Sequence, residues 1–263
     1  MVSGWGSYVY GVHGRVEKEY LPYAKVGNNG AFDNNSLLPS NWLVHGSSDA
    51  PFAFTLSEYD NSPLDRIVKR TGPGKSWHES GKGVTMGYHL NEANEVRLYR
   101  VTRDGALALD GYYRGGSLQK VIVKDEDGTQ NETFMDNDGR TVLSVNVNVG
   151  ERLETYSVYD DYGRLRYVLS PEASALLGNT INENVLERLA YRYRYDRYGR
   201  LIEKRLPGCA PVYMVYDRRD RLVLGQDGKQ RVENADKWSY FLYDGQNRMV
   251  ETGEVVITGT VTC

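Results

Sequence analysis

The 263-residue sequence contains little cysteine, proline or phenylalanine and no long apolar run. Two cysteines, Cys209 and Cys263, are too few for a disulfide framework. We expect both to be free, with one bond between them as the alternative. Eight prolines argue against low-complexity linkers. Because no apolar run reaches the ~20 residues that span a bilayer, membrane insertion is not expected.

An excess of positive charge is also missing. Lysine and arginine number 32 against 35 acidic residues, which gives a formal net charge of −3. Proteins that bind nucleic acid usually carry a basic excess, so no nucleic-acid partner is expected. Residues 1–8 lack the basic and apolar regions of a signal peptide. Because residues 8–22 look like the middle of a repeat, we expect this chain to be a fragment of a longer protein.

Tyrosine and glycine, in contrast, are abundant, with 21 and 28 copies. Together they favour half-buried strands joined by tight turns. A tyrosine–aspartate pair followed by Gly-Arg-Leu, or a close variant, also recurs along the chain. The copies at 159–165, 195–201, 216–222 and 243–249 read YDDYGRL, YDRYGRL, YDRRDRL and YDGQNRM, and a weaker copy at 135–141 reads MDNDGRT.

The spacing inside each copy predicts a β-hairpin. Aspartate favours the first position of a type I turn, and the residue three positions later must adopt a positive φ. Glycine adopts that conformation freely, and asparagine and aspartate tolerate it. The predicted turn-forming residues are Asp136, Gly139, Asp160, Gly163, Asp196, Gly199, Asp217, Asp220, Asp244 and Asn247.

We therefore predict an all-β fold of consecutive antiparallel hairpins with one short helical insertion, which begins at Pro171 and has a second helical turn within 184–189. The sequence divides into an irregular β region with degenerate repeats (1–130), a repeat region (131–253) and a tail (254–263). Within the first region we expect a long loop at 28–51 and a stretched repeat at 60–66.

The repeated units resemble the YD repeats of bacterial RHS-repeat proteins, and the resemblance extends to 15–23, 59–66, 93–97, 200–208 and 223–227. It implies hairpins stacked into a curved, spiralling strip or partial shell in a secreted or cell-surface protein. In polymorphic toxins and insecticidal toxin complexes such a shell encloses a toxic domain. With about five to seven units, this chain is not expected to close a shell alone.

No motif for catalysis, metal binding or a cofactor is coherent, so we expect neither a catalytic residue nor a cofactor. The Gly74-Lys75-Ser76 sequence lacks the earlier glycine of a phosphate-binding loop, and no helix is expected after it. A calcium loop at 136–139 lacks its glutamate. An enzyme site around His78, between Trp77 and Glu79, is the weakest of the alternatives.

The resemblance thus implies a non-catalytic scaffold of a surface or secreted protein that encloses or presents a partner polypeptide, or other segments of a longer protein. The alternative is a module that binds carbohydrate or cell wall. Tyr191, Tyr193 and Tyr195 would share one face of a strand and, with Trp77, stack on sugar rings. The same tyrosines would equally serve as cross-strand packing between hairpins.

Overall fold

The computed structural model describes residues 3–5, 7–25, 48–148 and 150–259. Sixteen mostly antiparallel strands form one long open sheet, in the order β2-β3-β5-β6-β7-β10-β11-β12-β13-β14-β15-β16-β17-β18-β19-β20. The pairs β1–β4 and β8–β9 form separate two-stranded sheets. The predicted all-β class built from consecutive hairpins is therefore confirmed.

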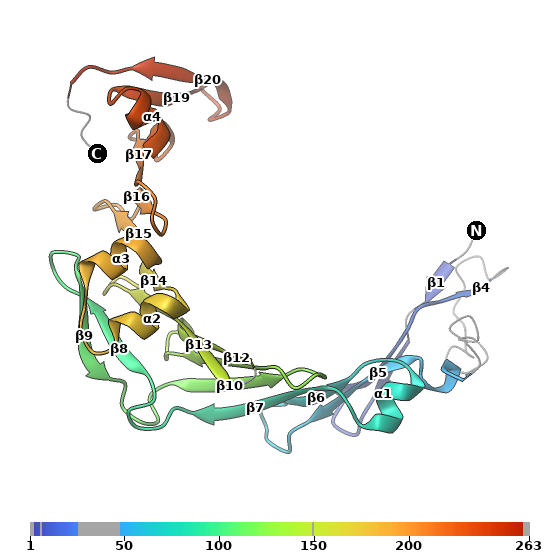
Figure 1. Cartoon of the computed structure of the whole chain (residues 1–263). Coiled ribbons are helices and arrows are strands. Elements are labelled where there is room, and N and C mark those ends of the chain that lie inside the picture. Colours follow the sequence, from blue (N-terminus) through green and yellow to red (C-terminus); the bar gives the residue numbers. More distant parts are fainter. Residues whose placement is uncertain (1–2, 6, 26–47, 149, 260–263) are drawn as a thin grey trace. The chain divides into compact units, whose positions relative to one another are not determined.

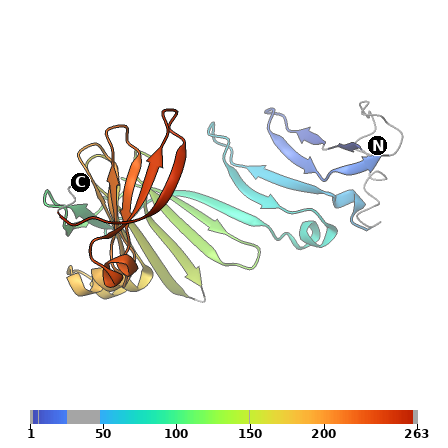
Figure 2. The same cartoon turned by 90° about the horizontal axis from the view of Figure 1, so that it is seen from above.

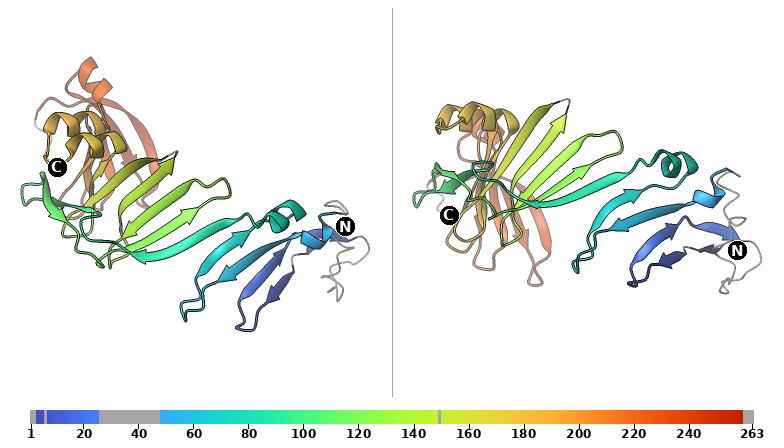
Figure 3. Two further views of the ribbon diagram at one scale, coloured as in Figure 1. Left: turned by 60° about the horizontal axis from the view of Figure 1, so that its bottom comes forward. Right: turned by 90° about the horizontal axis from the view of Figure 1, so that it is seen from below.

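The chain forms two compact units, and the first comprises residues 1–89, 120–132 and 147–149. Its elements are β1 (Ser3–Trp5), β2 (Tyr8–Tyr10), β3 (Val16–Tyr20), β4 (Tyr23–Lys25), the 3₁₀ helix η2 (Ala50–Phe52), β5 (Phe54–Tyr59), β6 (Ile67–Thr71), α1 (Lys75–Ser80), β7 (Val84–Leu90) and β10 (Gln119–Lys124). Helix α1 lies beside η2 (Figure 3). The Lys75 N–H at its start donates to the Asp49 carboxylate.

The second unit comprises residues 90–119, 133–146 and 150–263, so β11 (Gln130–Met135) and β12 (Thr141–Asn148) are divided between the units. Figure 1 labels most of the helices and strands of both units. The other elements of the second unit are β8 (Arg97–Val101), β9 (Leu107–Tyr112), β13 (Glu151–Tyr159), β14 (Leu165–Leu169), α2 (Pro171–Leu177), α3 (Glu183–Leu189), β15 (Ala190–Tyr195), β16 (Leu201–Arg205), β17 (Val212–Tyr216), β18 (Leu222–Gln226), α4 (Gly228–Glu233), β19 (Lys237–Tyr243) and β20 (Met249–Val256). Figure 2 shows strands β13 to β20 side by side.

Each hairpin of the repeat type has the same irregularity at its turn. In the β15–β16 hairpin the pairing of Arg194 with Glu203 is followed by a shift, and Tyr195 then pairs with Leu201. The same shift precedes Tyr159, Tyr216 and Tyr243. A bulge therefore places every repeat tyrosine opposite the residue that follows the turn arginine.

The core of the second unit lies where α2 packs on β13 and β14. The Ser170 hydroxyl caps α2 by accepting the Ala173 N–H, and Pro171 occupies the first helical turn. The most deeply buried apolar side chains of this unit come from helices, strands and loops: Val96, Leu118, Phe134, Leu143, Val145, Leu169, Leu177 and Leu186 are each at most 1% exposed. The helices thus cover apolar surface that hairpins alone would expose.

The prediction of a single helical insertion is incomplete. The insertion is present as α2 and α3, but α1 and α4 were not foreseen, and α1 begins at Lys75, where no helix was expected. Helix α4 has a capping box, in which Asp227 accepts the Gln230 N–H and the Gln230 side chain accepts the Asp227 N–H. That pair is visible in the sequence as Asp-x-x-Gln, so this helix was predictable.

Several predictions fall outside the described residues. Residues 26–47, which make up most of the predicted loop at 28–51, are not described, and neither is Cys263. Cys209 is exposed and free. The proposed tail from residue 254 begins within β20, which continues to Val256. The division of the sequence at residue 130 stays a prediction.

Replacing Phe134 by alanine should lower the free energy of unfolding by about 3–5 kcal/mol, because this fully buried ring would leave a cavity. Urea denaturation followed by circular dichroism measures the change. The control is Tyr162→Ala, which removes an 82% exposed ring that contacts the Arg164 guanidinium at the surface, and it should change stability by about 0.5 kcal/mol or less. Equal effects of the two substitutions would contradict this account of the core.

Candidate functional site

The repeat turns are the part of the molecule where polar side chains converge, and Asp196 shows how each turn is built. One carboxylate oxygen of Asp196 accepts the backbone N–H groups of Tyr198 and Arg200, both at 2.9 Å. Gly199 has a φ of 83°, and the equivalent positions Asp220 and Asn247 have φ values of 60° and 63°. Aspartates 136, 160, 217 and 244 accept the corresponding pairs of N–H groups.

The second carboxylate oxygen binds the arginine four positions later. Arg200 Nε donates to Asp196 Oδ2 at 2.6 Å, and the distance is 2.6–2.9 Å for Arg140, Arg164, Arg221 and Arg248. The stretched repeat at 60–66 forms the same ion pair across six residues, between Asp60 and Arg66 at 2.8 Å. Charge-assisted hydrogen bonds of this kind hold the guanidinium in one orientation.

These hydrogen bonds lower the pKa of the turn aspartates. At Asp160 burial is the largest single influence on the pKa and favours the neutral acid, but it is outweighed by the hydrogen bonds and charge of Arg164 together with the hydrogen bond from the Tyr162 N–H. The pKa is lowered at each of the six carboxylates: Asp60, Asp136, Asp160, Asp196, Asp217 and Asp244. The turn aspartates are therefore held ionised and are poorly suited to act as general acids near neutral pH.

Apart from Arg248, each turn arginine also reaches forward to the next hairpin in the described part of the chain. The Arg164 guanidinium lies 5.2 Å from the centroid of the Tyr195 ring, and its Nη1 donates to the Asp196 carbonyl at 3.3 Å. The Tyr195 hydroxyl donates in return to the Leu165 carbonyl at 3.0 Å. Arginine–tyrosine pairs of the same kind, 4.6–5.5 Å apart, are Arg15–Tyr59, Arg66–Tyr88, Arg140–Tyr159, Arg200–Tyr216 and Arg221–Tyr243. We call this series of contacts the arginine ladder.

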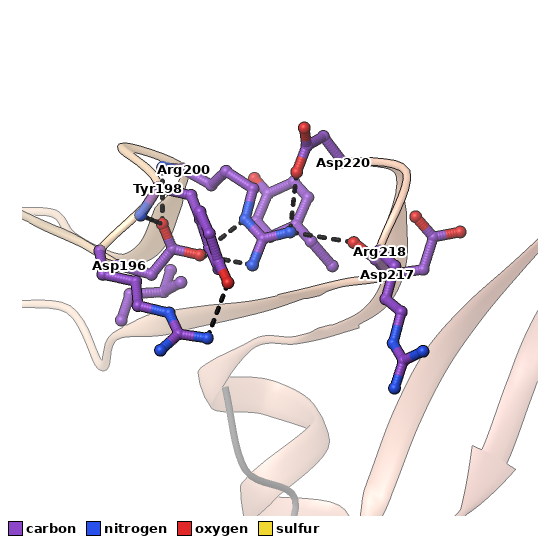
Figure 4. Close-up of a pocket in the computed structure, with 9 residues that line it drawn as sticks. Asp196, Tyr198, Arg200, Asp217, Arg218 and Asp220 are labelled. Carbon is purple, nitrogen blue, oxygen red and sulfur yellow. Dashed lines mark hydrogen bonds and ion pairs between the residues drawn. The ribbon is translucent and has the colours of Figure 1, made fainter.

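Figure 4 shows the step of the ladder at Arg200, which lies between two turns. Its guanidinium contacts Asp196 on one side, and the Asp217 carbonyl and the Asp220 carboxylate, each at 2.9 Å, on the other. A cleft of about 1030 Å³ opens here and is also lined by Arg197, Tyr198 and Arg218. Since Arg200 is already paired, the cleft offers exposed cationic and aromatic groups at its rim and no nucleophile paired with a base.

The tyrosine stripe predicted to bind carbohydrate lies on β15. Tyr191, Tyr193 and Tyr195 are each half-buried, and Tyr195 is engaged by the ladder through both its ring and its hydroxyl. Trp77 lies on α1, in the other compact unit, and is 38% exposed. Carbohydrate binding by these residues stays a prediction, for which Tyr195 is the least available of the four.

The weakest candidate, His78, is held by packing. Its Nε2 lies 3.1 Å from the Phe54 carbonyl, and its ring packs at 4.6 Å from the Phe54 ring. The neighbouring Glu79 pairs with Lys75. In the described part of the chain, no group of three or more His, Cys, Asp or Glu residues could hold a metal ion. No helix within those residues is long and apolar enough to cross a membrane.

Sequence reasoning missed the role of the turn arginine. The arginine recurs in the repeat at 135–141 and in the four copies after it, so the signal was present. Its pairing with the aspartate of its own turn follows from their constant spacing. Its contact with the tyrosine of the following hairpin cannot be predicted from spacing, because the distance between successive tyrosines of those four copies varies from 21 to 36 residues.

The fold is similar to parts of much longer solved chains. A crystal structure of TcdB2-TccC3-TEV matches 97% of this chain with a TM-score of 0.58 and 15% identity. A crystal structure of TcdB2-TccC3 and a Tc holotoxin pore from Photorhabdus luminescens each match with a TM-score of 0.57 and 14% identity, over 97% and 98% of this chain. This chain spans only about a tenth of the length of those chains.

A family model that is compared by sequence alone matches a smaller part of the chain. Residues 6–90 match a family model described as a domain of unknown function, DUF6443. No curated protein matches this sequence. Likeness to the Tc toxin chains is therefore a likeness of fold, and it agrees with the antiparallel hairpins described above.

Removing one rung of the ladder should destabilise the fold. Arg164→Ala removes an ion pair, cation–π contacts with Tyr162 and Tyr195, and a hydrogen bond to the next turn, so the free energy of unfolding should fall by about 2 kcal/mol. A double-mutant cycle with Tyr195→Ala should give a coupling of about 1 kcal/mol. The matched control is Arg219→Ala, an exposed turn arginine outside the ladder, and zero coupling between Arg164 and Tyr195 would refute the contact.

The lowered pKa values predict the dependence of stability on pH. An aspartate with a lowered pKa stabilises the fold above its unfolded pKa of about 3.9, and this contribution is lost as the pH falls through the folded value. Asp160→Asn should therefore be less stable than the wild-type chain at pH 7, and the difference should shrink below about pH 4. Urea midpoints between pH 7 and pH 2 test this, and a difference that stays constant would contradict it.

Proposed function

We propose that this chain is a non-catalytic segment of a β-hairpin wall in a longer RHS-type protein. The wall would enclose or present another polypeptide segment. The observation that carries the proposal is the arginine ladder, which uses the repeated polar residues to join each hairpin to the next. The similarity of fold to a tenth of the length of the Tc toxin chains supports it.

The geometry of the ladder favours a structural function over a chemical one. In the repeat at 195–201 both oxygens of Asp196 are occupied by hydrogen bonds within the turn, and Arg200 is occupied on both sides. Substrate binding at such a turn would have to break contacts that hold two hairpins together. A function of this chain is therefore expected on the surfaces that the hairpins build.

The proposed partner is another segment of the longer protein, and the proposed location is outside the cell or at its surface. Both come from the RHS resemblance and from the similarity of fold to Tc toxin chains. A wall made of hairpins suits this task because each hairpin contacts mainly its neighbours, so the wall extends by adding units without a new core for each. Whether such a wall encloses another polypeptide segment then depends on the number of hairpins in the longer protein.

The test is cryo-electron microscopy of the complete gene product that contains this chain, combined with limited trypsin digestion. We expect strands β13 to β20 in a wall, with a second polypeptide segment against it that resists trypsin. Arg164→Ala combined with Arg200→Ala should open the wall and make that segment sensitive to trypsin. The control Arg219→Ala should leave it protected.

Two results would overturn the proposal. The first is a complete protein in which no polypeptide segment lies against these strands. The second is enzymatic turnover that is lost when a side chain of the Arg200 cleft, such as Tyr198 or Arg218, is replaced without loss of folding.

A further inference from the structure

Successive hairpins are paired in one fixed register. The residue three positions after a turn arginine pairs with the residue three positions before the next ladder tyrosine. After Arg164 and before Tyr195 these residues are Tyr167 and Arg192. The other pairs that obey the rule are Lys18 with Leu56, Lys69 with Thr85, Glu203 with Tyr213, and Leu224 with Tyr240.

A second regularity concerns the tyrosine hydroxyl. It donates to the carbonyl of the residue that directly follows the arginine under its ring. The pairs are Tyr59 with Val16, Tyr88 with Ile67, Tyr159 with Thr141, Tyr195 with Leu165, and Tyr243 with Leu222, at 2.9–3.1 Å. Tyr216 is the exception, since its hydroxyl lies 3.9 Å from the Met214 sulfur.

At β20 the ladder stops in the described part of the chain. Arg248 pairs with Asp244 at 2.6 Å, but no described tyrosine ring lies against it, and its side chain is 72% exposed. The arginines that do contact a following tyrosine are only 19–37% exposed. Met249 and Val250, which follow Arg248, are 57% and 63% exposed.

Strand β20 also ends the strand order of the sheet. Its described hydrogen-bonded neighbour is β19, and its eight residues present a second edge of backbone N–H and C=O groups. A long edge strand with exposed apolar side chains readily pairs with a further strand. The described structure thus shows both an unpaired edge and an arginine oriented by its own turn.

We propose that the β20 edge is the docking site for a further hairpin whose first strand ends in Tyr-Asp. The tyrosine ring lies over Arg248, its hydroxyl donates to the Met249 carbonyl, and the residue three positions before it pairs with Glu251. That the hairpin comes from an adjoining segment of the longer protein rests on the proposed function above.

The described side chains at this edge favour this occupant over others. An apolar strand without the tyrosine would cover Met249 and Val250 and leave the Arg248 guanidinium without a ring. A second copy of this chain fits less well, because the strand that ends in Tyr-Asp is already paired on both sides in each of its described hairpins of this type. At the other end of its strand order Tyr10 is followed by Gly11, so the turn lacks the aspartate.

The probe is a fluorescently labelled cyclic peptide made from residues 190–205 of this sequence, which contain Tyr195-Asp196 and carry Arg192 three positions before the tyrosine. In the proposed register Arg192 of the peptide faces Glu251. Fluorescence anisotropy with the full 263-residue chain should show saturable binding. A peptide with Tyr195→Ala, which has the same charge, should bind about tenfold more weakly.

Variants of the chain test the site. Arg248→Ala should weaken peptide binding about tenfold, and Arg248→Lys should also weaken it because lysine lacks the planar guanidinium. Arg219→Ala, an exposed arginine in another turn, should leave binding unchanged. Far-ultraviolet circular dichroism and the urea midpoint verify that each variant is folded.

Disulfide trapping tests the register, in a chain with Cys209→Ser and Cys263→Ser. A peptide with Arg192→Cys should trap Glu251→Cys faster than Val250→Cys or Thr252→Cys. The proposal is overturned if no binding is detected, if Arg248→Ala binds equally well, or if a neighbouring position traps faster. Self-association of the chain that Arg248→Ala abolishes would assign the edge to a second copy and overturn it as well.

These results are independent of the test of the proposed function. Peptide binding measures the β20 edge alone, whereas microscopy of the complete protein asks whether a polypeptide is enclosed. A chain that binds the peptide in the stated register but belongs to a protein without an enclosed segment would refute the enclosure and leave the edge site intact.

Discussion

The contact on which the hairpin region depends is the one between a turn arginine, the aspartate of its own turn and the tyrosine of the next hairpin. The aspartate fixes the direction of the guanidinium, and the guanidinium then lies over the ring and reaches the next turn. The tyrosine hydroxyl returns a hydrogen bond to the strand that the arginine begins. A local turn motif is thereby converted into a contact between hairpins that are distant in sequence.

This arrangement explains how a sheet of this length maintains a single register. Many of its strands are short, with five or six residues, and backbone pairing alone would allow strands so short to slip. A slip by one residue would move the tyrosine off its arginine and turn its side chain to the other face. Where helices α2 and α3 cover the sheet, burial of apolar side chains adds a second constraint on register.

The same contact distinguishes the repeat side chains that hold the hairpins together from those that stay exposed at the turns. Groups that form the ladder are already engaged in contacts between hairpins, so their repetition reflects how the sheet is built. Side chains at the turns that lie outside the ladder, such as Arg197, Tyr198 and Arg218, remain exposed. At the β20 end, Arg248 has its aspartate but no described tyrosine, so this end of the sheet differs chemically from a covered strand.

The sequence by itself determined the hairpins, because a turn is set by residues within four positions of one another. Asp196 and Gly199, or Asp217 and Asp220, have the same local geometry wherever they occur. The helical insertion at Pro171 could likewise be predicted, since its signals are local caps. Helix α4 carried such a signal in Asp227 and Gln230, which was overlooked.

Only the tertiary structure decided which tyrosine each arginine contacts. It also decided that β7 pairs with β10, so that β8 and β9 form a sheet of their own, and that α1 packs beside η2. These features join segments separated by variable lengths of chain, and no spacing in the sequence specifies them. Local backbone preferences act over a few residues, whereas the pairing of hairpins depends on which side chains meet once the chain has folded.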